Sequence, residues 1–163
     1  MNADPILVAT TGGTIDKSYF DALSEYQIGD SVVAKLLQMA RVTHAYRVEE
    51  ISRKDSLDLD DADRERLRER IANAPETRVV VTHGTDTMTD SADVLKSIRG
   101  KTIVLTGALA PARFAESDAS FNLGMAFGVA QTAEAGVYIA MNGQVFRAGE
   151  VRKDRKAAQF VPM

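Results

Sequence analysis

The stretch TRVVVT, residues 77–82, decides the fold. Its middle holds three consecutive valines, and an uninterrupted β-branched run is typical of a strand that is buried on both faces of a parallel sheet. The run ends abruptly at His83 and Gly84. We therefore expect a central parallel strand over Thr77–Thr82, followed directly by a tight turn.

Similar strands alternate with helical segments on both sides of this stretch. Apolar runs predict further strands over Pro5–Thr10, Tyr46–Ile51, Lys101–Thr106 and Gly136–Met141. Apolar residues at helical spacing predict a helix capped by Asp30 or Ser31, one that starts among Asp58–Asp63, one over Met88–Ile98, and one over Ala119–Glu134. This alternation predicts an α/β fold with a doubly wound, mostly parallel sheet and helices on both faces, as in flavodoxin-like and Rossmann-like proteins.

Two glycine-containing details refine this prediction. Asn142-Gly143 is typical of a two-residue turn, so we expect a C-terminal β-hairpin into Gln144–Arg147. Gly124 and Gly128 lie four residues apart on one face of the last helix, which we interpret as close packing of that helix against the sheet.

The composition is that of an ordinary globular domain. The 163 residues carry a net charge of −3, with 45% hydrophobic and 26% charged residues, so nothing indicates a nucleic-acid or membrane partner. Cysteine is absent, which excludes disulfides and thiol chemistry. The first five residues, MNADP, do not resemble a signal peptide, so we expect a cytoplasmic protein.

In doubly wound sheets, ligands bind beyond the carboxyl ends of the strands. The residues at those ends are rich in hydroxyls and carboxylates and poor in cations: Thr11–Thr14, Lys54–Ser56, His83–Asp86 and Gly107–Leu109. This edge of the sheet is therefore the predicted functional site.

The turn TTGGT, residues 10–14, has two interpretations. A phosphate loop usually has a helix N-terminus directly behind it, yet no helix is evident until about residue 30, and the glycine spacing matches no nucleotide motif. A threonine nucleophile needs a nearby base, and flanking glycines let backbone N–H groups approach an oxyanion. The turn GTDT, residues 84–87, offers a second hydroxyl and a carboxylate, although the residues alone leave both interpretations open.

Three segments together carry a family resemblance. ATTGGTID (residues 9–16), VVVTHGTDTMTDSADVL (79–95), and TIVLTGALAP with SDASFNLGMAF (within 102–127) resemble the bacterial-type L-asparaginase family in content and order. The resemblance implies a doubly wound catalytic domain that hydrolyses L-asparagine to L-aspartate and ammonia through a threonine acyl-enzyme. It implies neither a cofactor nor a metal.

The resemblance also assigns catalytic roles. Thr14 corresponds to the family's primary nucleophile, and Tyr26 to the tyrosine that helps activate it. Thr85, Asp86 and Lys153 correspond to its Thr–Asp–Lys set, in which Asp86 holds the lysine and the lysine supports proton transfer through the threonine. Which threonine attacks first stays open.

The same comparison suggests substrate contacts. Ser56 corresponds to a serine that binds the α-carboxylate, with Asp55 as a weaker neighbouring candidate, and Asp86 would also bind the α-ammonium. Backbone contacts are expected from Gly13, Gly84 and Ala108, and the N–H groups of Gly13 and Thr85 are candidate oxyanion donors. Each of these has a structural alternative, such as a turn for Thr14 or a helix cap for Ser56. His83 and His44 are interpreted as structural and inert, respectively.

This sequence also differs from typical members of the family, and each difference leads to an expectation. Family members are about twice as long, with a second domain that supplies an acidic group near the ammonium, so we expect residues 1–163 to form a single stand-alone domain with weak substrate affinity and a raised KM. The surface that the second domain covers in longer family members would be exposed here, so we expect a homo-oligomer. The segment between Gly13 and Gly29 is expected to order over bound substrate. Ala110 replaces a frequent arginine, so contacts at that position are not carried over.

Two further functions compete with amide hydrolysis. One is a non-catalytic amino-acid-binding or regulatory domain that retained the fold. The other is an amidase subunit that supplies ammonia to a partner enzyme. The sequence also leaves asparagine against glutamine open, because one methylene in a pocket is worth only about 1–3 kcal/mol.

Overall fold

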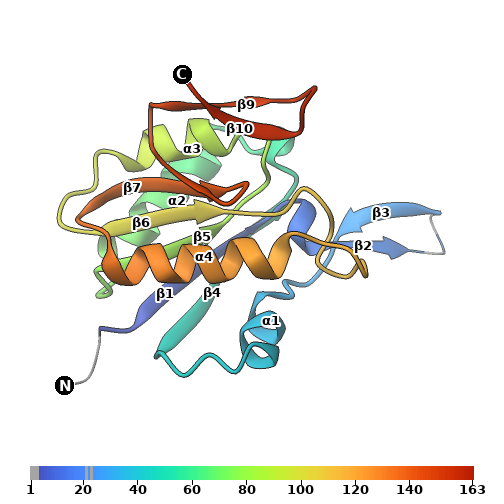
Figure 1. Ribbon diagram of the computed structural model, residues 1–163, viewed down its shortest axis with the longest axis horizontal. Coiled ribbons are helices and arrows are strands. Elements are labelled where there is room, and N and C mark those ends of the chain that lie inside the picture. The colour runs from blue at the N-terminus through green and yellow to red at the C-terminus, as the bar shows by residue number, and fades with distance from the viewer. Residues whose placement is uncertain (1–3, 21, 23) are drawn as a thin grey trace.

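The structure, a computed structural model, describes residues 4–20, 22 and 24–163. The expectation about a signal peptide falls mainly on residues 1–3, which lie outside this part. A six-stranded sheet forms the centre of the molecule (Figure 1). Its strands lie in the order β4 (Tyr46–Lys54), β1 (Ile6–Gly12), β5 (Arg78–Thr82), β6 (Thr102–Thr106), β7 (Gly136–Met141) and β8 (Gln144–Arg147).

The first five strands of this order are mutually parallel, and β8 pairs antiparallel with β7. Numbered along the chain, the parallel strands stand in the order 2-1-3-4-5, which is the flavodoxin-like arrangement. The predicted fold class is thereby confirmed. The stretch that suggested it, β5, lies between β1 and β6, and its three valines are fully buried.

Alternate side chains of the strands feed two separate cores. Leu7 and Val79 face one core, where α2 (Asp61–Asn73) and α3 (Met88–Leu95) cover the sheet. Ile6 and Val80 face the other core. That face is covered by α1 (Val33–Met39) and α4 (Ala119–Thr132) (Figure 1). Among the described residues, no helix has both the length and the apolar character needed to cross a membrane.

Three hairpins complete the chain. The turn between β7 and β8 has positive φ at both Asn142 (54°) and Gly143 (67°), as a type I′ turn requires, so the predicted C-terminal hairpin is confirmed. A second hairpin follows it, with β9 (Val151–Asp154) and β10 (Gln159–Pro162) lying over α3. The third, β2 (Lys17–Phe20) with β3 (Glu25–Ile28), projects from the carboxyl edge of the sheet (Figure 1).

The interpretation of Gly124 and Gly128 is wrong. A Cβ atom added at either glycine would meet no atom within 4 Å, and both residues are exposed. The sheet-facing side of α4 is instead formed by residues such as Leu123 and Phe127. The two glycines share a helix face, as predicted, but it is the open face, where spacing alone carries no information about packing.

Alanine at these positions is expected to stabilise the protein. Glycine in a helix interior is about 1 kcal/mol less favourable than alanine, so Gly124→Ala and Gly128→Ala should each raise the free energy of unfolding by roughly 0.5–1 kcal/mol in urea titrations. Gly100→Ala is the matched control, because a methyl group there also meets open space but φ is +74°. That variant should lose stability. A stability loss in both helix variants would contradict the open face.

Candidate functional site

The two threonine-glycine turns follow neighbouring strands at the point where the sheet changes winding direction. β1 and β5 pair in register from Ile6 with Arg78 to Thr10 with Thr82. The chain leaves β1 toward α1 on one face and leaves β5 toward α3 on the other. In folds of this kind, the carboxyl edge between two strands with opposite departures is the usual ligand position.

Glycines let three turns pack backbone against backbone. Gly13, at φ +86°, lies so close to Gly84 that an added Cβ would be 2.5 Å from its Cα atom. A Cβ on Gly84 would in turn be 2.6 Å from the Cβ of Ser56. Real Cβ atoms do not approach neighbours so closely. The turns after β1, β4 and β5 are therefore fixed together, which puts Thr14, Ser56 and Thr85 at one location.

Thr14 begins a single 3₁₀ turn, Thr14–Asp16, and its side chain is half-buried. The β2–β3 hairpin follows this turn, and the first α-helix starts only at Val33. The loop therefore lacks the helix N-terminus that a phosphate site of this kind uses. The local structure favours the nucleophile interpretation over phosphate binding.

Thr85, Asp86 and Lys153 form one hydrogen-bonded group. The Lys153 Nζ atom donates to Thr85 Oγ1 at 2.7 Å and to Asp86 Oδ1 at 2.8 Å. Arg155 lies 3.6 Å from the same Asp86 oxygen. The hydrogen bond from Lys153 lowers the pKa of Asp86 below its ordinary value, and burial opposes this only in part. Asp86 is thus held ionised beside a buried hydroxyl.

The β9–β10 hairpin carries Lys153 to this group. Phe160 on β10 is fully buried in the core and lies directly opposite Lys153 in the antiparallel register. Directly opposite residues point to the same face of a hairpin, so anchoring Phe160 also turns Lys153 inward. The backbone N–H of Phe160 donates to the Asn142 side chain at 2.7 Å, which ties the hairpin to the β7–β8 turn.

Ser56 is buried, and its hydroxyl accepts a long hydrogen bond of 3.4 Å from the Thr87 backbone N–H. The alternative role predicted for Ser56, a helix cap, is filled by Asp55 instead, because the Asp55 side chain accepts from the Leu57 N–H and caps the turn. Asp55 also lies 3.3 Å from Lys17. Of these two sequence-predicted contacts, Ser56 lies against Gly84 and Thr87, whereas Asp55 pairs with Lys17.

Tyr26 lies on β3, where 52% of its surface is exposed; its ring packs at a tilt against Tyr19 and edge-to-face against Phe114. Among the described residues it makes no hydrogen bond to Thr14. Tyr26 and Asp55 line a cavity of about 360 Å³ beside the β2–β3 hairpin. The connection between the two strands contains residues 21 and 23, so part of the segment expected to order over substrate lies outside the described residues.

The two backbone N–H groups predicted as oxyanion donors, those of Gly13 and Thr85, differ in whether they already donate a hydrogen bond. The N–H of Gly13 donates to the Lys54 carbonyl at 2.9 Å, so that hydrogen is already used at the edge of the sheet, which favours Thr85 as the oxyanion donor. The N–H of Thr85 has no acceptor among the described residues and stays a candidate.

Asp118 and Asn122 hold the turn that contains Ala108, and sequence reasoning missed both. The Asp118 carboxylate accepts from the N–H groups of Leu109 and Ala110 at 2.9–3.1 Å. The Asn122 amide donates to the Gly107 carbonyl at 2.8 Å. The segment SDASFN precedes and opens α4, so Asp118 has the sequence signature of a helix cap, but its carboxylate binds the preceding turn instead.

Asp16 is the third residue that sequence reasoning missed. Its buried carboxylate accepts from the Val32 N–H at 3.0 Å and from the Ser31 hydroxyl at 3.2 Å. Asp16 therefore helps to cap the start of α1, although it lies sixteen residues before Val32. Of the two predicted caps, Ser31 contributes a 3.3 Å contact to the Val33 N–H, and Asp30 is not the cap. Asp16 thereby fixes the polypeptide that follows Thr14.

Asp16 also predicts a pH dependence of stability. Burial raises its pKa from 3.8 to about 6, against the opposing hydrogen bonds and Arg113. An acid with a raised pKa contributes most below about pH 4, and the contribution falls as pH rises toward 6, by roughly 3 kcal/mol at most. Asp16→Asn can accept the same two hydrogen bonds and does not titrate. Its advantage in free energy of unfolding over the wild type should grow between pH 4 and pH 7 in urea titrations, and parallel pH curves would contradict this.

The two histidines lie in different surroundings. His83 is fully buried at the end of β5, and burial lowers its pKa to about 4, so it is neutral at pH 7. His44 is half-buried, and its ring hydrogen-bonds to the carbonyl of Ala45.

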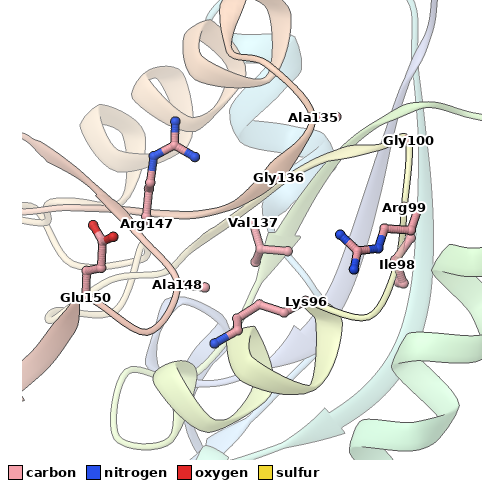
Figure 2. A pocket seen from close by; sticks show the side chains of 10 residues that line it. All are labelled: Lys96, Ile98, Arg99, Gly100, Ala135, Gly136, Val137, Arg147, Ala148 and Glu150. Carbon is pink, nitrogen blue, oxygen red and sulfur yellow. The ribbon is translucent and has the colours of Figure 1, made fainter.

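Another cavity, of about 340 Å³, lies at the opposite edge of the sheet (Figure 2). Gly100, just before β6, and Gly136, the first residue of β7, line it together with the side chains of Lys96, Arg99 and Arg147. It contains none of the predicted site residues. Within the described part of the chain, acidic and histidine side chains form no cluster of three or more that would hold a metal ion.

The sequence and the fold are similar to those of known proteins. The sequence profile described as "Asparaginase, N-terminal" matches residues 5–159. A "Probable L-asparaginase periplasmic" from Haemophilus influenzae is 33% identical over 94% of this chain and 47% of its own length. A "Glutaminase-asparaginase" from Acinetobacter glutaminasificans is 40% identical over 46% of this chain and 24% of its own.

The solved structure of L-asparaginase I from Vibrio cholerae superposes with a TM-score of 0.86 at 26% identity. The superposition covers 98% of this chain and 51% of that one. This chain therefore spans about half the length of the Haemophilus relative and of the Vibrio structure.

Proposed function

The chain belongs to the asparaginase family, and we propose on that basis that it hydrolyses the side-chain amide of L-asparagine to L-aspartate and ammonia. The observation that carries the proposal is the junction of two turns: Gly13 packs on Gly84, and the residue after Gly84 is bound by Lys153. This packing supports the proposal because it brings the turn that carries Thr14 next to the turn that carries Thr85 and Asp86. The N–H of Thr85 has no acceptor among the described residues.

The proposed chemistry has two steps. In the first, the Thr14 Oγ atom attacks the amide carbon, its proton passes through Thr85 toward the leaving nitrogen, and the C–N bond breaks to release ammonia. In the second, water attacks the resulting ester, its proton returns to Thr14 Oγ, and aspartate leaves. The Thr85 N–H supports the oxyanion in both steps, a contribution worth on the order of 3–4 kcal/mol of barrier.

Charge complementarity supports an α-amino acid as substrate. The ionised Asp86 suits the α-ammonium, and the Ser56 hydroxyl is the candidate donor to the α-carboxylate; hydrogen bonds to charged groups are about twice as strong as neutral ones. Lys17, which is close enough to contribute to the lowered pKa of Asp86, adds positive charge for the carboxylate. The choice between asparagine and glutamine stays open, as do the predicted homo-oligomer, raised KM and cytoplasmic location.

Ammonia release tests the proposal. The 163-residue chain is incubated with L-asparagine, L-glutamine and D-asparagine, and ammonia and the acidic product are quantified together. Equal amounts of ammonia and L-aspartate from L-asparagine are expected. Binding of L-aspartate in a calorimetric titration without any ammonia release would contradict hydrolysis and favour the non-catalytic amino-acid-binding alternative.

A further inference from the structure

His83 connects the core of the protein to the backbone of the proposed site. Its side chain is fully buried, and its own N–H donates to the Thr106 carbonyl at 2.9 Å, which fixes the end of β5 against β6. The next residue, Gly84, is one of the glycines that pack the turns together. The imidazole therefore starts from a fixed position directly beneath the turn.

The two ring nitrogens have different partners, and these partners determine the tautomer. Nδ1 lies 2.6 Å from the Gly84 carbonyl oxygen, which can only accept, so Nδ1 carries the hydrogen. Nε2 lies 2.7 Å from the Ser91 hydroxyl, which then donates to it. Burial keeps the ring neutral, since it lowers the pKa of His83 to about 4. One neutral tautomer satisfies both contacts.

The Gly84 carbonyl and the Thr85 N–H belong to the same peptide unit. That unit is planar and trans, so the two groups point in opposite directions. Holding the carbonyl toward the buried imidazole turns the N–H away from the core. This matters because glycine allows many peptide orientations, and an unrestrained Gly84 would let the Thr85 N–H rotate.

We propose that His83 is a positioning residue: it holds the Gly84 carbonyl so that the Thr85 N–H stays directed at the oxyanion of the reaction. The proposal rests on the proposed amide hydrolysis. It gives the histidine between the strand and the turn a role in the transition state without contact to substrate. Ser91 acts one step behind it, by selecting the tautomer that donates through Nδ1.

Two substitutions separate positioning from simple core packing. His83→Asn keeps a nitrogen donor near the Nδ1 position, whereas His83→Gln places its amide near the Nε2 position and loses the donor to Gly84. We expect His83→Gln to lower kcat by roughly 10- to 100-fold with KM changed less than about threefold, and His83→Asn to retain most of kcat. A packing role would destabilise both variants without lowering kcat of the folded protein.

Nitrogen NMR provides readouts that do not need activity. In the wild type, imidazole ¹⁵N shifts should show hydrogen on Nδ1, and the Thr85 amide resonance should move in His83→Gln but not in His83→Asn. A wild-type ring protonated on Nε2, or equal kcat losses in both variants, would overturn the proposal, and the tautomer measurement decides it even where neither variant folds. A wild type that releases no ammonia but has the Nδ1 tautomer would instead overturn the proposed hydrolysis.

Discussion

Thr14→Val is expected to lower kcat for asparagine hydrolysis by at least about 1000-fold, equivalent to about 4 kcal/mol of transition-state stabilisation. Valine has the shape of threonine without the hydroxyl, so it removes the proposed nucleophile and little else. Thr14 is only half-buried and makes no side-chain hydrogen bond within the described residues. The unfolding midpoint should therefore change little, which separates chemistry from folding.

Thr14→Ser is the matched variant, because it keeps the hydroxyl and removes only a methyl group. It should retain measurable turnover, and mass spectrometry of the wild type quenched during turnover should find the acyl group on residue 14. A Thr14→Val variant that keeps more than a tenth of wild-type kcat would contradict the assignment. Thr85→Val would then show whether the second threonine attacks first.

Lys153→Met is the second variant with a large expected effect. The lysine ammonium can only donate, so Thr85 Oγ1 must accept from it, and the threonine hydrogen is left to be donated toward the leaving nitrogen. Methionine fills similar space without a donor. We expect kcat to fall by about 100- to 1000-fold, in the range of general acid–base contributions, with a smaller change in KM because Asp86 remains.

The same variant has a pH signature. Lys153 is the main cause of the lowered pKa of Asp86, so its removal should raise that pKa. As pH falls, Asp86 would be protonated earlier, and the acidic limb of the kcat/KM profile should move to higher pH. Lys156→Met, an exposed lysine three residues further on, is the matched control and should leave kcat unchanged. Equal losses in both variants would refute the special role of Lys153.

Much of the fold could be predicted because its determinants are local. The valine run of β5, the helical spacing of Met88, Ala92 and Leu95, and the Asn142-Gly143 turn each depend on neighbours within a few residues. The ends of the strands could also be predicted from the sequence, and in a doubly wound sheet ligands bind beyond the carboxyl ends of the strands. The resemblance then identified which of the polar residues at that edge belong to one chemical group.

Contacts between distant residues could not be predicted in the same way. Local spacing cannot show which face of a helix is covered, and Gly124 and Gly128 proved to lie on the open one. Nor can it show where an N–H is already used, as at Gly13, or that a carboxylate sixteen residues away caps a helix, as Asp16 does for α1.

The sequence by itself determined the order of strands and helices, the residues available at the carboxyl edge and the absence of thiol chemistry. Only the tertiary structure decided the strand order in space and the contact of Gly13 with Gly84. It also decided that Lys153 binds Thr85 and Asp86, which lie 68 and 67 positions earlier in the chain. The physical reason is that backbone preferences act over a few residues. Side-chain partners are instead selected by packing of the whole chain, here by the burial of Phe160 opposite Lys153.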